Sequence, residues 1–241
     1  MKHLLLILLA LPTLAFAQNE KKYVRFLPLG ELPDWKEELI DGVRVQAEPP
    51  AGALPPTIIS APNGPEDIQK KGLTLRQPTG FMTFGAQAGS LSLHEGEVAG
   101  GVAWLKSPMP NATFSLGVLF RDNTEMSWKS PKMVLLNDSK DALPAGSIRF
   151  VNVSDLKAIV KVGGKSEVIQ PGGIVIKTLK EGDNPILAGY YAKNGAVVMI
   201  FQNSVKLLQN QRVQAFFFKG QGDKPRTDVK FISFPEPLPR P

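Results

Sequence analysis

The sequence predicts an all-β fold, a β-sandwich of immunoglobulin-like type, made of two packed sandwich-like halves. Short alternating or apolar runs recur along the chain and are separated by turn residues. The 241 residues include 22 Gly and 21 Pro, and these punctuate the runs. Only residues 34–40 and 205–210 have helical character, and both segments are too short to form a layer of a domain. A sandwich is therefore the expected architecture.

The expected strands follow one another at short intervals. They are 23–29, 73–76, 90–94, 113–121, 132–136, 148–153, 159–162, 174–179, 196–202, 212–219 and 227–234. In one of them, Phe216, Phe217 and Phe218 are consecutive, so their rings cannot all point to one side of the strand. Either both faces of this strand are covered, or one ring is exposed or contacts a partner.

Two glycine-containing segments are interpreted as turns. Gly163-Gly164-Lys165-Ser166 matches the end of a phosphate-binding loop, but the position of the first motif glycine is Ile159 and the flanking segments have strand patterns. A hairpin turn is the better interpretation, because glycine readily adopts the positive φ angles of tight turns. Pro171-Gly172-Gly173 is expected to be the next turn, before the strand that starts at Ile174.

Residues 1–17 have the pattern of a secretory signal peptide. Lys2 precedes an apolar run from Leu4 to Leu14, and Ala15-Phe16-Ala17 forms a small-x-small cleavage site. We therefore expect a working protein of residues 18–241 that is exported to a periplasmic or extracellular location. No later run approaches the roughly 20 apolar residues that a membrane helix needs, so no transmembrane segment is expected in the mature chain.

Composition excludes some kinds of chemistry. The chain has no Cys, which excludes thiol catalysis and cysteine zinc sites, while 43% hydrophobic and 21% charged residues indicate a folded protein. Residues 18–130 contain 11 Lys/Arg and 13 Asp/Glu, or −2, whereas residues 131–241 contain 16 and 9, or +7. A basic half could contact anionic envelope polymers or lipid headgroups, but 12 of its 16 cations are scattered lysines, typical of solvated strands. The absence of Arg-rich patches argues against nucleic acid as a partner.

A weak internal repeat suggests how the halves arose. Residues 23–32 and 147–156 align without gaps, and Arg25-Phe26 coincides with Arg149-Phe150. Duplication of a sandwich domain explains this match, and chance resemblance between two strands explains it almost as well.

The expected domain organisation follows from composition. It comprises a β-rich region 18–130 with an irregular Pro-rich loop 48–65, a sandwich domain 131–234, and a Pro-rich tail 235–241. The boundary is expected between Trp128 and Pro144, and the tail is expected to be an extended, polyproline-like end.

The histidine content limits catalysis. His94 is the only histidine in residues 18–241, so a histidine metal cluster cannot form and any Ser-His-Asp triad must include it. Ser90, Ser92 and Glu95 are suitable neighbours, but no Gly-x-Ser-x-Gly motif is present. A surface histidine on a strand is the expected state.

Two groups of carboxylates could hold calcium or serve as an acid–base pair. They are Asp34/Glu37/Glu38/Asp41 and Asp122/Glu125, and neither has the ligand spacing of a known loop. Residues 121–125 are better interpreted as an exposed hairpin loop. We therefore predict no metal ligand, no cofactor, no catalytic residue and no enzymatic activity.

Aromatic side chains are the remaining candidates for ligand contacts. Exposed Trp and Tyr rings could stack on the C–H faces of sugars, although core packing is the default for most of them. The candidate residues are Trp35, Trp104, Trp128, Tyr190 and Tyr191.

The segment from Pro144 to Asn152 (Pro-Ala-Gly-Ser-Ile-Arg-Phe-Val-Asn), with Pro171-Gly172 and Gln211-Arg212 further on, carries a family resemblance. It resembles uncharacterised exported bacterial proteins with a Pro-x-Gly-x-[IV]-Arg-[FV]-x-Asn strand. The resemblance implies an envelope β-sandwich domain over residues 131–234 and no catalytic residues. The short side chains of Asn152 and Ser154 are expected to bond the backbone where the strand ends.

These observations favour an exported protein that acts through its surfaces. A structural or protein-interaction role in the cell envelope is the first hypothesis, with an envelope protein or polysaccharide as the partner. A carbohydrate-binding module that uses exposed Trp or Tyr is the alternative, and a hydrolase is less favoured because it needs converging residues in a pocket.

Overall fold

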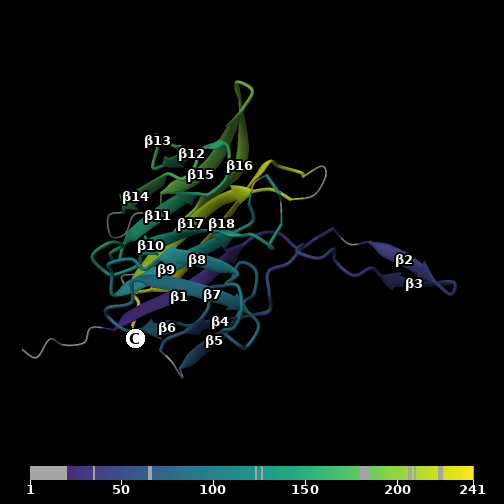
Figure 1. Ribbon diagram of the computed structural model, residues 1–241. Helices are drawn as coiled ribbons and strands as arrows, with labels where there is room; N and C mark the ends of the chain where they lie inside the picture. Colours follow the sequence, from purple (N-terminus) through teal and green to yellow (C-terminus); the bar gives the residue numbers. More distant parts are fainter. Residues whose placement is uncertain are drawn as a thin grey trace, which may run out of the picture.

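The computed structural model describes residues 21–34, 36–64, 67–122, 124–125, 127–179, 185–205, 208, 210–221 and 225–240, and these residues form strands and no helix (Figure 1). The strands are β1 Lys22–Leu29, β2 Glu37–Ile40, β3 Val43–Gln46, β4 Ile58–Pro62, β5 Ile68–Gly72, β6 Met82–Phe84, β7 Ser90–Glu95, β8 Leu105–Pro108, β9 Phe114–Phe120, β10 Lys132–Asn137, β11 Ser147–Asn152, β12 Lys157–Val162, β13 Lys165–Ile169, β14 Ile174–Thr178, β15 Ile186–Lys193, β16 Ala196–Ser204, β17 Gln211–Lys219 and β18 Val229–Pro237. The all-β prediction is confirmed.

Four four-stranded sheets form two sandwiches. The first sandwich pairs an inner sheet, β10-β9-β1-β6, with an outer sheet, β5-β4-β7-β8. The second sandwich pairs an inner sheet, β14-β11-β17-β18, with an outer sheet, β13-β12-β15-β16. Strands β2 and β3 form a separate hairpin that projects away from both sandwiches (Figure 1).

Each sandwich has its own core between its two sheets. In the first, Val24 and Phe26 of β1 pack with Ile59 of β4 and Leu91 of β7. In the second, Phe150 of β11 packs with Val160 of β12, Leu187 of β15 and Phe217 of β17. Both cores follow from strand alternation, because every second side chain points into the sandwich.

A third apolar cluster joins the two inner sheets face to face. Leu27, Leu116 and Val118 of the first sandwich pack against Val151, Phe216 and Phe218 of the second. Phe217 faces the other way, into the core of its own sandwich. Both faces of β17 are therefore covered, which was one of the outcomes expected for the three consecutive phenylalanines.

The two sandwiches have the same strand order. β1 corresponds to β11, and β4 to β10 correspond in order to β12 to β18. With this correspondence, every pair of neighbouring strands in the sheets of the first sandwich has an equivalent pair in the second. Both β1 with β9 and β11 with β17 are parallel pairs, and Arg25 lies opposite Leu116 as Arg149 lies opposite Gln214. The aligned segments that contain Arg25 and Arg149 are thus equivalent strands, which is the arrangement that a duplication predicts.

Several local predictions need correction. Residues 73–76 form a turn closed by a bridge from Thr74 to Gln77, because the chain reverses there. Residues 37–40 are a strand, since Asp41-Gly42 provides a tight turn to β3. The loop predicted over 48–65 contains β4. The second domain was expected to begin at residue 131, but β10 pairs with β9 and therefore belongs to the first sandwich. The other helical segment, 205–210, lies partly outside the described residues.

The C-terminal tail also differs from the expectation. β18 continues through Pro235 to Pro237 and pairs with β17 along this length. The prolines are tolerated because β18 is an edge strand, where a missing N–H need not bond a neighbour. This places Glu236 in the sheet rather than in a free end.

The glycine turns agree with the prediction. Gly163 and Gly164 connect β12 to β13 with φ angles of 54° and 87°, and Gly172, with φ 76°, lies in the turn before β14. The predicted signal peptide lies outside the described residues. Within the described part of the chain, there is no helix of the length and apolarity required to span a membrane.

Candidate functional site

A cluster of buried charged side chains lies between the two inner sheets. We call it the buried charge network. It consists of Arg25 on β1, Asp138 just after β10, Arg149 on β11, Arg212 and Gln214 on β17, and Glu236 on β18. Arg212, Gln214 and Asp138 are fully buried, so each sandwich contributes charge to a contact that excludes water.

Asp138 is the centre of this network. Its Oδ2 accepts hydrogen bonds from Nε and Nη2 of Arg25, at 3.0 and 2.7 Å. Its Oδ1 accepts from Arg149 Nη2 at 2.9 Å, Arg212 Nη2 at 2.7 Å and Gln214 Nε2 at 2.9 Å. One carboxylate therefore holds three arginines, drawn from both sandwiches.

Glu236 provides the second negative charge. Its Oε1 accepts hydrogen bonds from Arg25 Nη2 at 2.7 Å, Arg212 Nε at 3.0 Å and Gln214 Nε2 at 2.9 Å. Its Oε2 accepts no hydrogen bond from the described residues, although Arg25 Nη2 lies 2.7 Å away as an ion-pair partner. Glu236 thus links the last strand of the second sandwich to β1 of the first.

The network is related by the same equivalence as the strands. Arg25 corresponds to Arg149, and Leu116 corresponds to Gln214 through the parallel pairings. The backbone N–H of Asp138 donates to the carbonyl of Phe114 on β9. In the second sandwich, Glu236 lies opposite Arg212 of β17, the residue that corresponds to Phe114. Asp138 and Glu236 are therefore equivalent positions of the two sandwiches, two residues beyond Leu136 and Phe234 respectively.

The remaining members break this symmetry. Arg212 and Gln214 on β17 correspond to Phe114 and Leu116 on β9, so only the second sandwich adds polar groups there. Three arginines then face two carboxylates, and the network carries one excess positive charge. The backbone carbonyls of Asn137, Asp138 and Leu143 accept the remaining guanidinium hydrogen bonds.

The two equivalent arginines, Arg25 and Arg149, differ in the direction of their pKa shifts. Burial lowers the pKa of Arg25 more than any other single cause, but the charges and hydrogen bonds of Asp138 and Glu236 together outweigh it and raise this pKa. Burial lowers the pKa of Arg149, and the neighbouring charge of Arg212 lowers it further against the attraction of Asp138. The carboxylates thus favour the cation at Arg25 more than at Arg149.

This arrangement joins the two sandwiches. Each carboxylate accepts hydrogen bonds from Arg25 of the first sandwich and Arg212 of the second. A buried ion-pair network with all its members hydrogen-bonded fixes the orientation of the parts that contribute to it.

The sequence contained a partial signal of this network. The internal repeat aligned Arg25 with Arg149. Alternation on β1 and β11 could have placed both arginines on the face opposite Phe26 and Phe150. Asp138 and Glu236 were missed, because each follows a predicted strand, 132–136 or 227–234. The segments that contain them are polar or Pro-rich, which is typical of solvent exposure.

The strand-end motif of β11 is as expected. The side-chain amide of Asn152 donates to the carbonyls of Leu156 and Ile169, at 2.8 and 3.0 Å. Its Oδ1 accepts from the backbone N–H and the hydroxyl of Ser154, at 3.1 and 2.7 Å. The role of these two residues is therefore local bonding of the backbone.

The five candidate aromatic residues do not form one surface. Trp128 and Tyr191 are 1% and 4% exposed and pack in the two cores. Trp104 is half-buried, and its indole N–H donates to the carbonyl of Trp128 at 2.7 Å. Tyr190 is half-buried on the outer sheet of the second sandwich, and Trp35 lies outside the described residues. Their ligand contacts stay a prediction.

His94 differs from the expected surface histidine. It is 8% exposed, on the strand β7 that the sequence predicted, and lies opposite Ser60 of β4. In the described residues, neither His94 Nδ1 nor Ser60 Oγ has a hydrogen-bond partner. Nearby, Lys70 on β5 forms an exposed ion pair at 3.0 Å with Glu97, in the loop after β7.

The carboxylate groups have local roles. Asp122 accepts a hydrogen bond from the backbone N–H of Thr124 at 2.7 Å and pairs with Lys132 at 2.5 Å. The hydrogen bond with Lys132 and then that from Thr124 hold the pKa of Asp122 well below its ordinary value. Glu37, Glu38 and Asp41 lie on the exposed hairpin. Among the described residues, no three His, Asp or Glu side chains lie close enough together to hold a metal ion.

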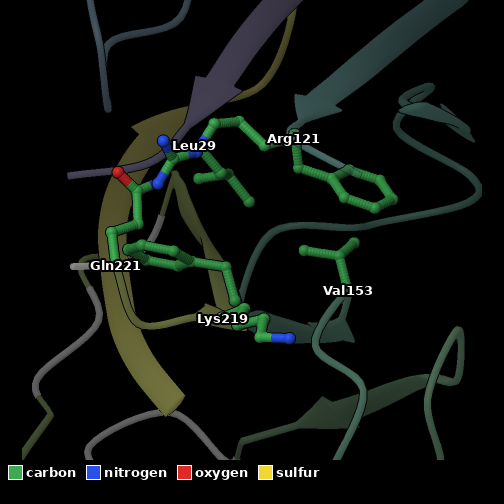
Figure 2. Close-up of a pocket in the computed structure, with 7 residues that line it drawn as sticks. Leu29, Arg121, Val153, Lys219 and Gln221 are labelled. Atoms are coloured by element: carbon green, nitrogen blue, oxygen red, sulfur yellow. The ribbon is translucent and has the colours of Figure 1, made fainter. Parts of the chain in front are cut away.

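Figure 2 shows a small hollow at one end of the interface between the inner sheets. Its volume is about 10 Å³, roughly that of one water, and Leu29, Phe120, Val153 and Phe218 contribute its apolar wall. Arg121 extends across it toward Gln221 (Figure 2). Burial lowers the pKa of Arg121, while Glu31 opposes this. The hollow is too small for an organic ligand.

Larger hollows are shallow and lie at the surface. One of about 360 Å³ is lined by Pro49, Pro50 and Leu54 at the base of the hairpin, and others of about 380 and 330 Å³ adjoin Lys21. None of them contains His94 or a residue of the buried charge network. The described residues therefore contain a buried, charged interface between the two sandwiches and hollows at the surface. A scan against protein-family models found no match to this chain, and a search of curated proteins found none either.

Proposed function

We propose that this protein is exported and has a structural or protein-interaction role in the cell envelope. The pattern of residues 1–17 supports export. The hollows beside Leu29, Leu54 and Lys21 are lined by neither His94 nor the buried carboxylates, which favours surfaces as the means of action.

The observation that carries this proposal is the hairpin β2–β3. Leu39, Ile40 and Val43 are 70%, 53% and 62% exposed, on an element that projects into solvent (Figure 1). A two-stranded hairpin is marginally stable alone in water, and exposed apolar side chains on it mark a contact surface.

The rest of the molecule is suited to present this hairpin. The apolar interface between the inner sheets and the buried charge network join the two sandwiches as a rigid support. An interaction protein benefits from such a support, because little ordering entropy is then lost when the hairpin binds.

Site-specific photo-crosslinking in the producing cells tests this proposal. A photoreactive residue at Val43 should give a discrete adduct in the envelope fraction, from a protein whose N-terminus is Gln18. The same residue at Val102, which is 96% exposed in a loop of the first sandwich, is the matched control. Retention of residues 1–17 in the cytosol, or equal adducts at both positions, would contradict the proposal.

A further inference from the structure

Two exposed surfaces of this chain are complementary to each other in length, polarity and charge. The first is one face of the hairpin β2–β3. The second is the outer face of the sheet β13-β12-β15-β16, the face that points away from the core. A contact between these surfaces rests on the proposed interaction role and gives that role one partner.

The hairpin has one mainly apolar face. Ile40 lies opposite Val43 and Glu38 lies opposite Val45, so these four residues share a face. Leu39 and Arg44 lie on the other face, where Arg44 pairs with Glu37 at 3.5 Å. Residues 37–46 contain three acids and one arginine, so the hairpin has a net charge of −2.

The outer face of the second sandwich has an apolar row across all four strands. Ile159 on β12 lies opposite both Val168 and Tyr190, and Tyr190 lies opposite Met199. Val168 and Met199 are 52% and 55% exposed, and Val197, two residues before Met199 on β16, is 60% exposed. This row faces outward because Ala158 and Val160, its neighbours on β12, pack in the core.

Positive charge flanks the apolar row. Lys157 and Lys161 lie on either side of Ile159 and share its face, and both are exposed. Glu167 is the one acid in these four strands, and it pairs with Lys177 of β14 at the sheet edge. A negatively charged apolar segment therefore suits this surface better than a neutral one.

The first sandwich shows why the row is open. There, Ser60 and His94 of the outer sheet are buried, nine residues, 96–104, connect β7 to β8, and Glu97 of this loop pairs with Lys70 of β5. In the second sandwich, the equivalent strands β15 and β16 are joined by two residues, Asn194 and Gly195. No long loop is therefore available at this connection to cover the outer face.

We infer that the apolar face of the hairpin of one copy binds the outer face of the second sandwich of another copy. Ile40, Val43 and Val45 lie on the row of Ile159, Tyr190 and Met199, and Glu38 and Asp41 meet Lys157 and Lys161. The hairpin projects away from β12–β16 of its own chain, so a second copy supplies the acceptor (Figure 1). Reciprocal binding gives a closed two-fold dimer with two equal contacts.

The dimensions agree with this contact. Four residues of a strand extend over ~13 Å, and the three spacings between four neighbouring strands add to ~14 Å. The hairpin, with four residues in each strand, therefore matches the width of the sheet β13-β12-β15-β16. Burial of three or four aliphatic side chains on each of two contacts supports a weak to moderate dimer.

Sedimentation and light scattering of the purified protein, residues 18–241, over a range of concentrations test this inference. The native sequence should dimerise, and the Val43→Asp and Met199→Asp variants should each weaken the dimer at least about tenfold. Val102→Asp is the matched control and should leave the dimer unchanged, since this valine is exposed elsewhere. The near-ultraviolet circular dichroism of each variant verifies that it is folded.

Mixing the two weakened variants provides the sharper test. A Val43→Asp chain retains its acceptor face and a Met199→Asp chain retains its hairpin, so the mixture should form a heterodimer through one intact contact. A native protein that stays monomeric, variants that do not weaken the dimer, or a mixture that associates no better than its components would overturn the inference. An adduct from Val43 with a different envelope protein would then leave the proposed function intact, whereas loss of both results would reject both.

Discussion

The two sandwiches share their strand order but differ in the residues at their interface and in the residues on their outer sheets. At the interface, β9 of the first sandwich presents Phe114 and Leu116, whereas β17 of the second presents Arg212 and Gln214 at the equivalent positions. On the outer sheets, the first sandwich has buried Ser60 and His94, and the second has an open row that includes Ile159 and Met199. The same framework can therefore carry different contacts, because alternate strand positions face the core and the surface independently.

The interface accommodates this asymmetry with one excess positive charge. Glu236, at the position equivalent to Asp138, pairs with Arg212, so three arginines meet two carboxylates. The two acids are equivalent by position but not by contact, because Asp138 accepts from all three arginines. Substitutions at equivalent positions can measure how far the two halves differ.

Removal of the carboxylates has the largest expected effect. Asp138→Ala should lower the free energy of unfolding by about 3–5 kcal/mol, because three buried arginines lose a shared partner. Glu236→Ala should cost less, since Arg25 and Arg212 each retain Asp138. Urea unfolding of both variants gives the comparison. Glu97→Ala, at an exposed ion pair, is the control and should change stability by less than about 1 kcal/mol. Equal losses for Asp138 and Glu236 would show that the network is energetically symmetric.

Substitution of the less buried of the two equivalent arginines should cause the larger loss in the free energy of unfolding. Arg25→Met should cost about 3 kcal/mol and Arg149→Met about 1–2 kcal/mol, although Arg149 is the more buried. Loss of Arg149 removes the repulsion from Arg212, and loss of Arg25 removes attraction to both carboxylates. Thermal and urea unfolding of the two variants provide the measurement. A larger loss for Arg149 would mean that its bonds to Asn137 and Gln214 outweigh the excess charge.

An exchange of core residues between the halves should have an intermediate effect. Gly117 lies opposite Phe26 on β1, and its equivalent in the second sandwich is Ala215, opposite Phe150. A Cβ at Gly117 would lie 2.8 Å from Phe26 Cδ1 and 2.9 Å from Met133 Sδ. Gly117→Ala should therefore destabilise the protein by about 1–3 kcal/mol through overpacking. An unchanged unfolding midpoint would indicate that Phe26 and Met133 can repack as the second core has done.

The smallest expected effect is the pH dependence that Asp228 contributes in the second sandwich. Hydrogen bonds from Lys193 first, and also from Tyr191, lower the pKa of Asp228 below its ordinary value of 3.8. Its stabilising contribution is therefore complete above that value and is lost as the pH falls through the lower, folded-state pKa. Asp228→Asn should reduce the melting temperature slightly at pH 7, and the difference from the native protein should vanish at the acid end.

Lys193→Met provides the matched control for this pH dependence. It removes the same ion pair, which measures 2.7 Å, and should reproduce most of the change in the acid limb. A difference between native protein and the Asp228→Asn variant that stays constant from neutral to acid pH would contradict the assignment to this pair.

Particular residues show what the sequence alone could predict. Alternation at Phe216–Phe218 required both faces of that strand to be covered or one ring to be free, and Gly163-Gly164 required a tight turn. The weak repeat identified β1 and β11 as equivalent strands. Asp41-Gly42 between Ile40 and Val43 was a hairpin signal that the helical interpretation of 34–40 overrode.

The burial of charge could not be predicted in the same way. Arg25 and Glu236 are far apart in the chain. Arg25 occupies a position that, taken alone, is typical of a solvent-facing strand residue, and Glu236 lies in a Pro-rich segment that predicts a free end. His94 likewise has a strand pattern that gives no sign of its burial. Local sequence determines to which side of a strand a side chain points, and it does not determine what packs against that side.

The sequence by itself thus determined an all-β chain, because periodicity and turn residues act over a few neighbouring positions, and its weak repeat left duplication and chance resemblance as alternatives. Tertiary structure alone decided that three arginines and two carboxylates meet between the sandwiches, and which sheet faces remain open. The physical reason is that burying a charge is unfavourable unless partners surround it, and here those partners come from strands distant in sequence that only the packing of two sheets brings together.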